Sequence, residues 1–310
     1  MKLLLTGASG LVGSNFARAA AQRGHHVIGT VGAYNGALPG LAEKRIVDLS
    51  DADALTHLSL EIFPDAIVNA AAISEPAACD KDPIRSAAMN VALPAQLARL
   101  AQHLSARFIH LSSEQVFDGC GSIPYTPDDA VAPINLYGRQ KNESEHAVIA
   151  NAPNFSAIIR APLLMGNSPG GRRGVHERLL TDWSLGRPAK LYVDEFRQPC
   201  TAENLADAML ELVERPTLCG VFHWAGTELV SRFELGARIR AHFHLSAERA
   251  PLIAVSRAET PEISAQRQAS LPLDLSALRR CLKTPAQSIA EQLPTLAIPS
   301  HCHEWLQASV

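Results

Sequence analysis

Several features that mark other classes of protein are missing from this chain of 310 residues. Aromatic residues make up only 5% and the formal net charge is -3, so nothing in the composition indicates nucleic-acid binding. No apolar run approaches the ~18 residues of a membrane-spanning helix, and the apolar run after Met1 is too short for a secretory signal. We therefore expect a cytoplasmic protein that binds neither nucleic acid nor membrane.

The cysteines lack the spacing of a disulfide framework or a zinc site. No C-x-x-C pair occurs among the six, which are Cys79, Cys120, Cys200, Cys219, Cys281 and Cys302. We expect reduced thiols and no metal site. With balanced charge and few aromatics, the partners that we expect are small molecules.

What the sequence does contain is a regular alternation of apolar runs and amphipathic stretches. Six apolar runs predict strands covered on both faces, namely Lys2–Thr6, His26–Gly29, Arg45–Val47, Ala66–Asn69, Arg107–Ser112 and Ser156–Arg160. Between them, helical periodicity covers Leu11–Arg23, Asp53–Ile62, Pro83–His103 and Leu136–Ala150. This order predicts an α/β fold with a doubly wound parallel sheet of the Rossmann type.

The alternation loosens after about residue 165. Further helices are predicted at Ala202–Arg215, Arg232–Phe243, Leu275–Cys281 and Pro285–Gln292, separated by loops that contain proline. We therefore expect a dinucleotide-binding domain over 1-165 and a smaller, mixed α/β substrate-binding region over 166-310. Residues 202-225 are expected to return to the first domain.

The first predicted strand runs directly into a glycine-rich turn and then a helix. Glycines at positions 7, 10 and 13 allow a tight turn, a close approach of the backbone to a pyrophosphate, and close packing of helix on strand. The candidate cofactor-binding residues of this turn are Gly7, Ser9, Gly10, Leu11, Val12 and Gly13. The G-x-x-G-x-x-G spacing resembles that of the short-chain dehydrogenase/reductase family.

The end of the second strand bears on the choice of nicotinamide cofactor. Gly29–Gly32 contains no acid that would repel a 2′-phosphate, and Lys44 or Arg45 could reach one. NADP is therefore favoured, with NAD or dual use left open. Asp48 and Leu49 match the family position that meets the adenine ring, although a helix N-cap region is an equally good interpretation of this stretch.

Tyr137 and Lys141 stand four residues apart in a predicted helix, which places both side chains on the same face. The phenol of tyrosine has a pKa near ~10, so a tyrosine that exchanges protons at neutral pH needs a charge that stabilises its anion. At roughly 5 Å and an effective dielectric of about 20, an ammonium contributes on the order of 3 kcal/mol, or about two pKa units. Such pairs are also common on helix surfaces, so this interpretation depends on the neighbouring motifs.

The motif order over nearly the whole chain resembles that of the extended short-chain dehydrogenases/reductases. Its motifs are Asn69–Ala72, Leu111–Gly119 and Tyr137–Lys141. Three segments look like those of the dTDP-4-dehydrorhamnose reductases, namely Val116–Gly119, Asp194–Pro199 and Ala202–Asp207. The regulatory relatives of methionine adenosyltransferase share part of this pattern.

The resemblance implies catalytic roles for three residues. Ser113 would hydrogen bond to the substrate carbonyl, Tyr137 would protonate its oxygen, and Lys141 would hold the nicotinamide ribose and lower the pKa of Tyr137. Tyr137 and Lys141 thus also count as cofactor-binding residues, together with the segment that follows the fourth strand, Ala70, Ala71 and Ala72.

Other positions bear on the substrate. Glu114 and Gln115 replace the Asp-Tyr of the reductases, and Gln115 cannot take a proton, which argues against 4,6-dehydration. Glu114, Arg172 and Arg197 are the candidate substrate contacts. Arg172 could clamp a diphosphate or lie in a solvated loop.

The resemblance implies NAD(P)H-dependent reduction of the 4-keto group of a nucleotide-activated deoxysugar, as in dTDP-rhamnose biosynthesis. Two alternatives stay open. One is a sugar-nucleotide epimerase of the same superfamily, and the other is a non-catalytic NAD(P)-binding regulatory subunit resembling that of methionine adenosyltransferase. The expected substrate is a nucleotide sugar, and a homodimer is left open.

Overall fold

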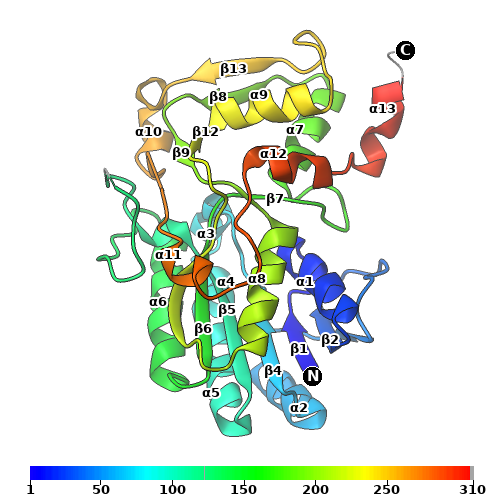
Figure 1. Cartoon of the computed structure of the whole chain (residues 1–310), viewed down its shortest axis with the longest axis vertical. Coiled ribbons are helices and arrows are strands. Elements are labelled where there is room, and N and C mark those ends of the chain that lie inside the picture. The colour runs from blue at the N-terminus through cyan, green and yellow to red at the C-terminus, as the bar shows by residue number, and fades with distance from the viewer. Residues whose placement is uncertain (122, 308–310) are drawn as a thin grey trace.

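A computed structural model describes residues 1–121 and 123–307, which form a seven-stranded sheet with a smaller region at one end (Figure 1). The strand order is β11-β6-β5-β4-β1-β2-β3, and these neighbours pair in parallel. The strands are β1 (Lys2–Thr6), β2 (His26–Val31), β3 (Glu43–Ile46), β4 (Ala66–Asn69), β5 (Arg107–Ser113), β6 (Ser156–Ala161) and β11 (Gly220–His223). The order reverses at β1, so the expected doubly wound parallel sheet is confirmed.

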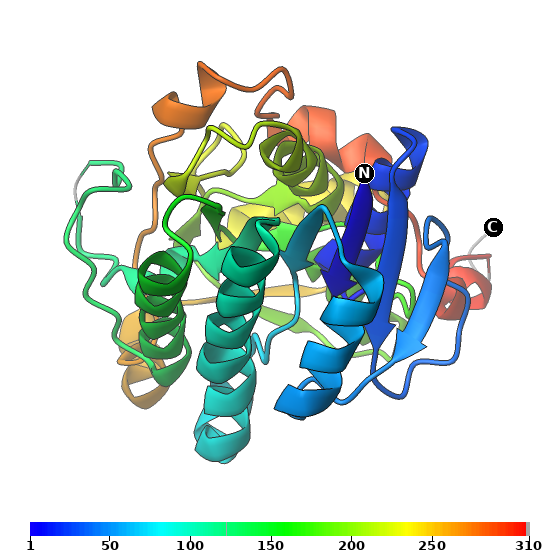
Figure 2. The ribbon, with the colours of Figure 1, turned by 90° about the horizontal axis from the view of Figure 1, so that it is seen from below.

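Helices cover both faces of the sheet because its strands are apolar on both sides. On one face Leu3 and Leu5 pack with α1 (Leu11–Gln22) and α8 (Ala202–Glu214). On the other, Leu4 packs with three helices that Figure 2 shows side by side, namely α2 (Ala52–Ile62), α5 (Leu93–Leu104) and α6 (Leu136–Asn151). Alternation along β1 thus divides the interior into two layers.

The single helix expected over Pro83–His103 is interrupted. The structure has α4 (Pro83–Ala87), a π-helical turn (Ala88–Ala92) and then α5. Pro94 lacks the N–H that would bind the carbonyl of Asn90 four residues earlier, and the π turn lies at that point. The Asn90 side chain is also bound to Ile73 and Gln140, so tertiary contacts hold the irregular turn.

The smaller region lies over the carboxyl ends of the parallel strands (Figure 1). Its core includes Trp183, Leu235 and Ile239, between α7 (Val175–Ser184) and α9 (Arg232–His242). The sequence did not predict α7. Its strand pairs are β7 (Leu164–Met165) with β10 (Cys200–Thr201), β9 (Phe196–Arg197) with β12 (Val230–Ser231), and β8 (Ala189–Tyr192) with β13 (Leu252–Val255).

The remaining elements are short. They are α3 (Pro76–Lys81), α10 (Pro261–Ser264), α11 (Ser276–Arg279), α12 (Ile289–Gln292), α13 (His303–Gln307) and four 3-10 turns at Glu114–Val116, Arg257–Glu259, Leu293–Thr295 and Ser300–Cys302. The helix predicted at Pro285–Gln292 begins only at Ile289, because Ser288 and Glu291 form a capping box there.

The chain returns from the smaller region to the sheet before leaving it again. α8 packs against α1, and β11 pairs with β6 at the edge of the sheet. We keep the division into 1-165 and 166-310 as a proposal, with α8 and β11 assigned to the sheet on these contacts.

Candidate active site

A cavity of about 930 Å³ opens where the carboxyl ends of the strands face the smaller region. Its lining includes many of the predicted site residues, namely Gly10, Leu11, Val12, Ala70, Ala71, Ala72, Ser113, Glu114, Tyr137, Lys141, Arg172 and Arg197. Other predicted residues lie outside this lining, namely Gly7, Ser9, Gly13, Asp48 and Leu49. The fold therefore brings the predicted catalytic and substrate residues together with the start of α1.

The glycine-rich turn has the shape of a phosphate cradle. Gly7 has φ +70°, and a Cβ there would lie 2.7 Å from the Ala71 nitrogen. A Cβ at Gly13 would collide with the Gly7 carbonyl, and a Cβ at Gly10, which lines the cavity, would lie 3.1 Å from the same oxygen. Gly10 is the N-cap of α1 and provides no side-chain cap, so the first amides of the helix can bind an anion. This geometry fits the pyrophosphate of a dinucleotide.

Asp48 and Leu49 have local roles in the structure. The Asp48 carboxylate accepts hydrogen bonds from the Ser50 hydroxyl and amide, at 2.7 and 2.9 Å, and these bonds lower the pKa of Asp48. Leu49 is partly buried against the layer of α2 and α5, and Asp51 is the residue that caps α2. A contact of Asp48 and Leu49 with adenine stays a prediction.

The three candidate catalytic residues come from two adjoining elements. Ser113 ends β5, and its hydroxyl accepts a hydrogen bond from the Gln115 amide at 3.2 Å. Tyr137 and Lys141 lie on α6, which approaches the turn after β5 so closely that a Cβ at Gly138 would collide with the Gln115 carbonyl. Glycine at position 138 thus places the two elements in contact.

Burial dominates the acidity of Tyr137. It raises the pKa of this phenol to about 12, although a hydrogen bond with the Ser113 hydroxyl acts in the opposite direction. The expected lowering of the Tyr137 pKa by Lys141 is not seen. Lys141 Nζ instead donates to the Leu111 carbonyl at 2.6 Å, and burial lowers the pKa of Lys141 to about 8.

A buried polar network behind Lys141 was not anticipated from the sequence. His110 lies on β5, with Nδ1 3.1 Å from Asn69 Nδ2 and Nε2 3.0 Å from Ser144 Oγ. Since an amide nitrogen only donates, we assign the proton of the imidazole to Nε2. Burial holds the pKa of His110 well below its usual range, so the ring is neutral.

A cluster of acids and arginines forms the other wall of the cavity. Glu195 accepts two hydrogen bonds from Arg267 at 2.6 and 2.8 Å, and it lies 3.3 Å from Arg197 and 3.9 Å from Arg232. Burial alone would raise the pKa of Glu195, but the hydrogen bonds from Arg267 and the neighbouring positive charges outweigh it. Three guanidinium groups therefore share one ionised carboxylate.

Glu114 lies between this cluster and Ser113. Its Oε1 is 3.3 Å from Arg197 Nε, and its Oε2 finds no hydrogen-bond partner in the part of the chain that the structure describes. Burial raises the pKa of Glu114 to about 8, and the charge of Arg197 only partly opposes this. At neutral pH this side chain is a neutral carboxylic acid.

Sequence reasoning singled out Arg197 but missed Arg232 and Arg267. These residues are 35 and 70 positions away along the chain, and no linear spacing connects them. Arg172 lines the cavity and is exposed. This position fits a contact with a diphosphate as well as a place in a solvated loop.

Residues 1–121 and 123–307 contain neither a metal-binding cluster nor a membrane-spanning helix. No group of three or more His, Cys, Asp or Glu side chains there is arranged to hold a metal ion. Within the same residues, no helix has both the length and the apolar character needed to cross a membrane.

The chain is similar to a subunit of a methionine adenosyltransferase and to a probable reductase of glycan biosynthesis. It is 30% identical over 283 residues to methionine adenosyltransferase 2 subunit beta of Rattus norvegicus, covering 89% of this chain and 81% of the relative. It is 31% identical over 242 residues to the probable low-salt glycan biosynthesis reductase Agl14 of Haloferax volcanii, covering 77% of this chain and 79% of that one.

Solved structures share the fold over almost the whole chain. A hypothetical dTDP-4-dehydrorhamnose reductase from Sulfolobus tokodaii has a TM-score of 0.79 at 27% identity, covering 96% of this chain and 100% of that one. A dTDP-4-dehydrorhamnose reductase from Bacillus anthracis, solved in complex with NADP, has a TM-score of 0.80 at 20% identity, covering 94% and 97%. The model of the RmlD substrate binding domain matches residues 1–300. The chain therefore belongs to the RmlD substrate-binding domain family, which confirms the resemblance to dTDP-4-dehydrorhamnose reductases within the extended short-chain dehydrogenases/reductases.

Proposed function

We propose that this protein reduces the 4-keto group of a nucleotide-activated deoxysugar with NAD(P)H. The family match supports an oxidoreductase of the sugar-nucleotide reductase type. The observation that carries the proposal is that Ser113, Tyr137 and Lys141 line one cavity, which also exposes the uncapped start of α1.

Reduction needs a protonated Tyr137, and burial keeps the proton on this phenol. With a pKa of about 12, the phenol keeps its proton at neutral pH and can donate it. The nicotinamide, when bound, supplies a hydride to the carbonyl carbon. Ser113 holds the carbonyl oxygen, and Tyr137 protonates this oxygen as it becomes an alkoxide, which is a stronger base than a phenolate.

Two features support NADP over NAD. The end of β2 carries no acid that would repel a 2′-phosphate. Lys44 Nζ lies beside the loop that follows β2, 3.4 Å from the carbonyls of Asn35 and Gly36, whereas Arg45 is paired with Glu43 and Glu61. Lys44 is thus better placed than Arg45 for a 2′-phosphate.

The arginines of the cavity support a nucleotide-sugar substrate. Arg197, Arg232 and Arg267 bring more positive charge to its wall than Glu195 neutralises. A diphosphate would supply the missing negative charge, with Arg172 as a further contact at the exposed side.

The experiment is NADPH oxidation with a panel of 4-keto-6-deoxysugar nucleotides, using wild type and Tyr137→Phe. The variant lacks the proton donor, so we expect turnover to fall by at least ~100-fold. NADPH affinity, measured by fluorescence titration, should change by less than about twofold because the ring stays in place. Undiminished turnover in Tyr137→Phe would contradict the assignment. Interconversion of sugars without net NADPH consumption would indicate the epimerase alternative.

The regulatory alternative rests on the 30% identity to methionine adenosyltransferase 2 subunit beta. It requires a stable complex with a methionine adenosyltransferase catalytic subunit and no ketoreductase turnover. Size-exclusion chromatography of the mixture, alongside the NADPH assay, separates the two functions.

A further inference from the structure

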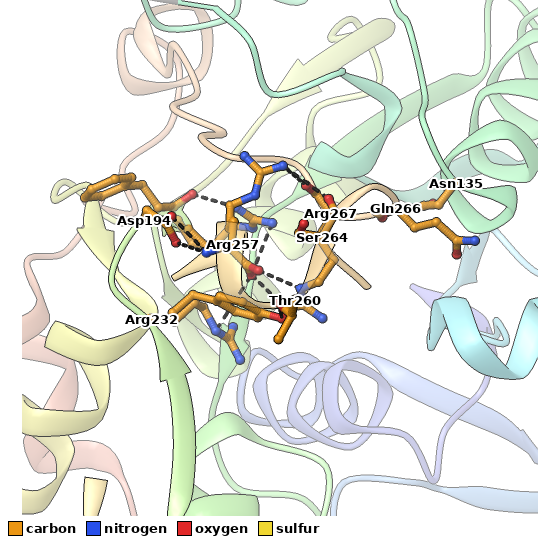
Figure 3. Close-up of polar contacts among 12 residues, drawn as sticks. Asn135, Asp194, Arg232, Arg257, Thr260, Ser264, Gln266 and Arg267 are labelled. Atoms are coloured by element: carbon orange, nitrogen blue, oxygen red, sulfur yellow. Dashed lines mark hydrogen bonds and ion pairs between the residues drawn. The ribbon is translucent and has the colours of Figure 1, made fainter. Parts of the chain in front are cut away.

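Residues 257–268, called the strap here, cross the cavity on the side of the smaller region. The strap contributes Glu262, Ile263, Gln266, Arg267 and Gln268 to the cavity lining. Figure 3 shows Arg257 at its start reaching the Asp194 carboxylate, and Gln266 near its end lying beside Asn135. The strap therefore bridges the smaller region and the catalytic helix.

The first part of the strap is fixed to the smaller region. The Asp194 carboxylate accepts the Arg257 amide at 2.9 and 3.0 Å, and the Thr260 and Tyr192 hydroxyls lie 2.8 Å apart. Further along the strap, the Arg267 guanidinium donates two hydrogen bonds to the Glu195 carboxylate and lies over the Tyr192 ring.

The last part of the strap is fixed to the elements that carry the catalytic hydroxyls. Gln268 Nε2 donates to the carbonyls of Gln115 and Phe117, both at 3.2 Å, in the segment that follows Ser113. Asn135 Nδ2 donates to the Gln266 carbonyl at 3.1 Å.

The side-chain amide of Asn135 makes hydrogen bonds in two directions, with its oxygen to α6 and with its nitrogen to Gln115 and the strap. Its Oδ1 accepts from the Gly138 amide at 2.8 Å and so caps α6, two residues before Tyr137. Its Nδ2 donates to Gln115 Oε1 at 3.0 Å as well as to the strap. Asn135 is 2% exposed, so these partners replace water.

We propose that Asn135 is a positioning residue. It holds the strap over the sugar site at a fixed place relative to Tyr137. The inference rests on the proposed function, since the strap lines the cavity that the keto-sugar would occupy. The amide nitrogen holds the strap, and the amide oxygen holds the helix. Loss of the nitrogen should therefore weaken substrate binding while the proton donor stays in place.

Asn135→Ser separates these two contributions. Serine keeps an N-cap acceptor for Gly138, but it is too short to reach Gln115 and Gln266 as a donor. Two lost hydrogen bonds predict a KM for the keto-sugar nucleotide that is about 10-fold higher, with kcat within about threefold of wild type. Asn135→Ala loses the cap as well, so kcat should also fall.

Hydrogen exchange gives a readout that needs no turnover. With NADPH bound, amides of residues 257–268 in Asn135→Ser should exchange at least about fivefold faster than in wild type, because the tether to Gln266 is lost. Asn151→Ser is the matched control, since Asn151 lies at the far end of the same helix and, among the described residues, its side chain bonds only to the nearby Ala147 carbonyl. It should leave exchange in the strap unchanged.

Unchanged exchange of the strap in Asn135→Ser would overturn the proposal, as would an unchanged KM. If the wild type reduces no sugar of the panel, the proposed function fails, but the exchange measurement still decides whether Asn135 holds the strap.

Discussion

At the scale of single residues, burial determines the acid chemistry of the cavity. Tyr137 and Glu114 both hold their protons at neutral pH because their anions are poorly solvated, and Lys141 has a lowered pKa for the same reason. The four-residue spacing correctly placed Tyr137 and Lys141 on one face of α6. It could not show that the Leu111 carbonyl, 30 residues earlier, would hold the ammonium.

Glu114 should make stability depend on pH. Native Glu114 keeps its proton up to about pH 8, whereas an unfolded glutamate loses it near 4.5. The native state therefore binds more protons in this interval, and its contribution to stability falls as pH rises through it. Glu114→Gln removes this dependence, so the melting temperature of the variant relative to wild type should be higher at pH 9 than at pH 5.

Thermal unfolding of both proteins at the two pH values measures this difference. Glu143→Gln is the control, since Glu143 is exposed on α6 and should give the same small difference at both pH values. An identical pH dependence in Glu114→Gln and wild type would show that Glu114 ionises normally.

At the scale of elements, the sequence predicted what is local and missed what depends on distant contacts. The strands of the first half were anticipated within about two residues at each end because they are apolar on both faces. The π turn within Pro83–His103 was not, since Asn90 is held there by Ile73 and Gln140. Likewise, the cluster of Glu195, Arg232 and Arg267 forms only when the residue before β9, the start of α9 and the strap come together.

The close contact between α6 and the turn after β5 makes the fold sensitive to substitution of Gly138. Gly138→Ala would push a methyl group into the Gln115 carbonyl and separate Tyr137 from Ser113. We expect a loss of about 1–3 kcal/mol in the free energy of unfolding, measured by urea denaturation, together with reduced turnover. Gly170→Ala is the control, because no atom of residues 1–121 or 123–307 lies within 4 Å of a Cβ built there. Equal stability of the two variants would contradict this account.

At the scale of the whole molecule, cofactor binding should stabilise the fold. A ligand present at 100 times its Kd adds about 2.7 kcal/mol to the free energy of unfolding, so NADPH should raise the melting temperature of wild type. In Gly10→Val, the new side chain would crowd the turn that lines the cavity, because its Cβ would lie 3.1 Å from the Gly7 carbonyl oxygen. Its melting temperature should hardly respond to NADPH, while Gly170→Ala should respond like wild type. A full response in Gly10→Val would place the dinucleotide elsewhere.

Because α8 and β11 return to the sheet, cutting the chain at residue 165 does not yield two separate modules for protein engineering. A chain cut after residue 165 would leave Phe16 and Ala20 of α1 without the α8 surface that completes their layer. It would also make β6 an edge strand, paired with β5 alone. A gene fusion that replaced everything after that point would therefore remove part of the core around the seven-stranded sheet along with the smaller region. New specificity is better introduced into the loops between α8, β11 and the later elements than by exchanging the two regions as modules.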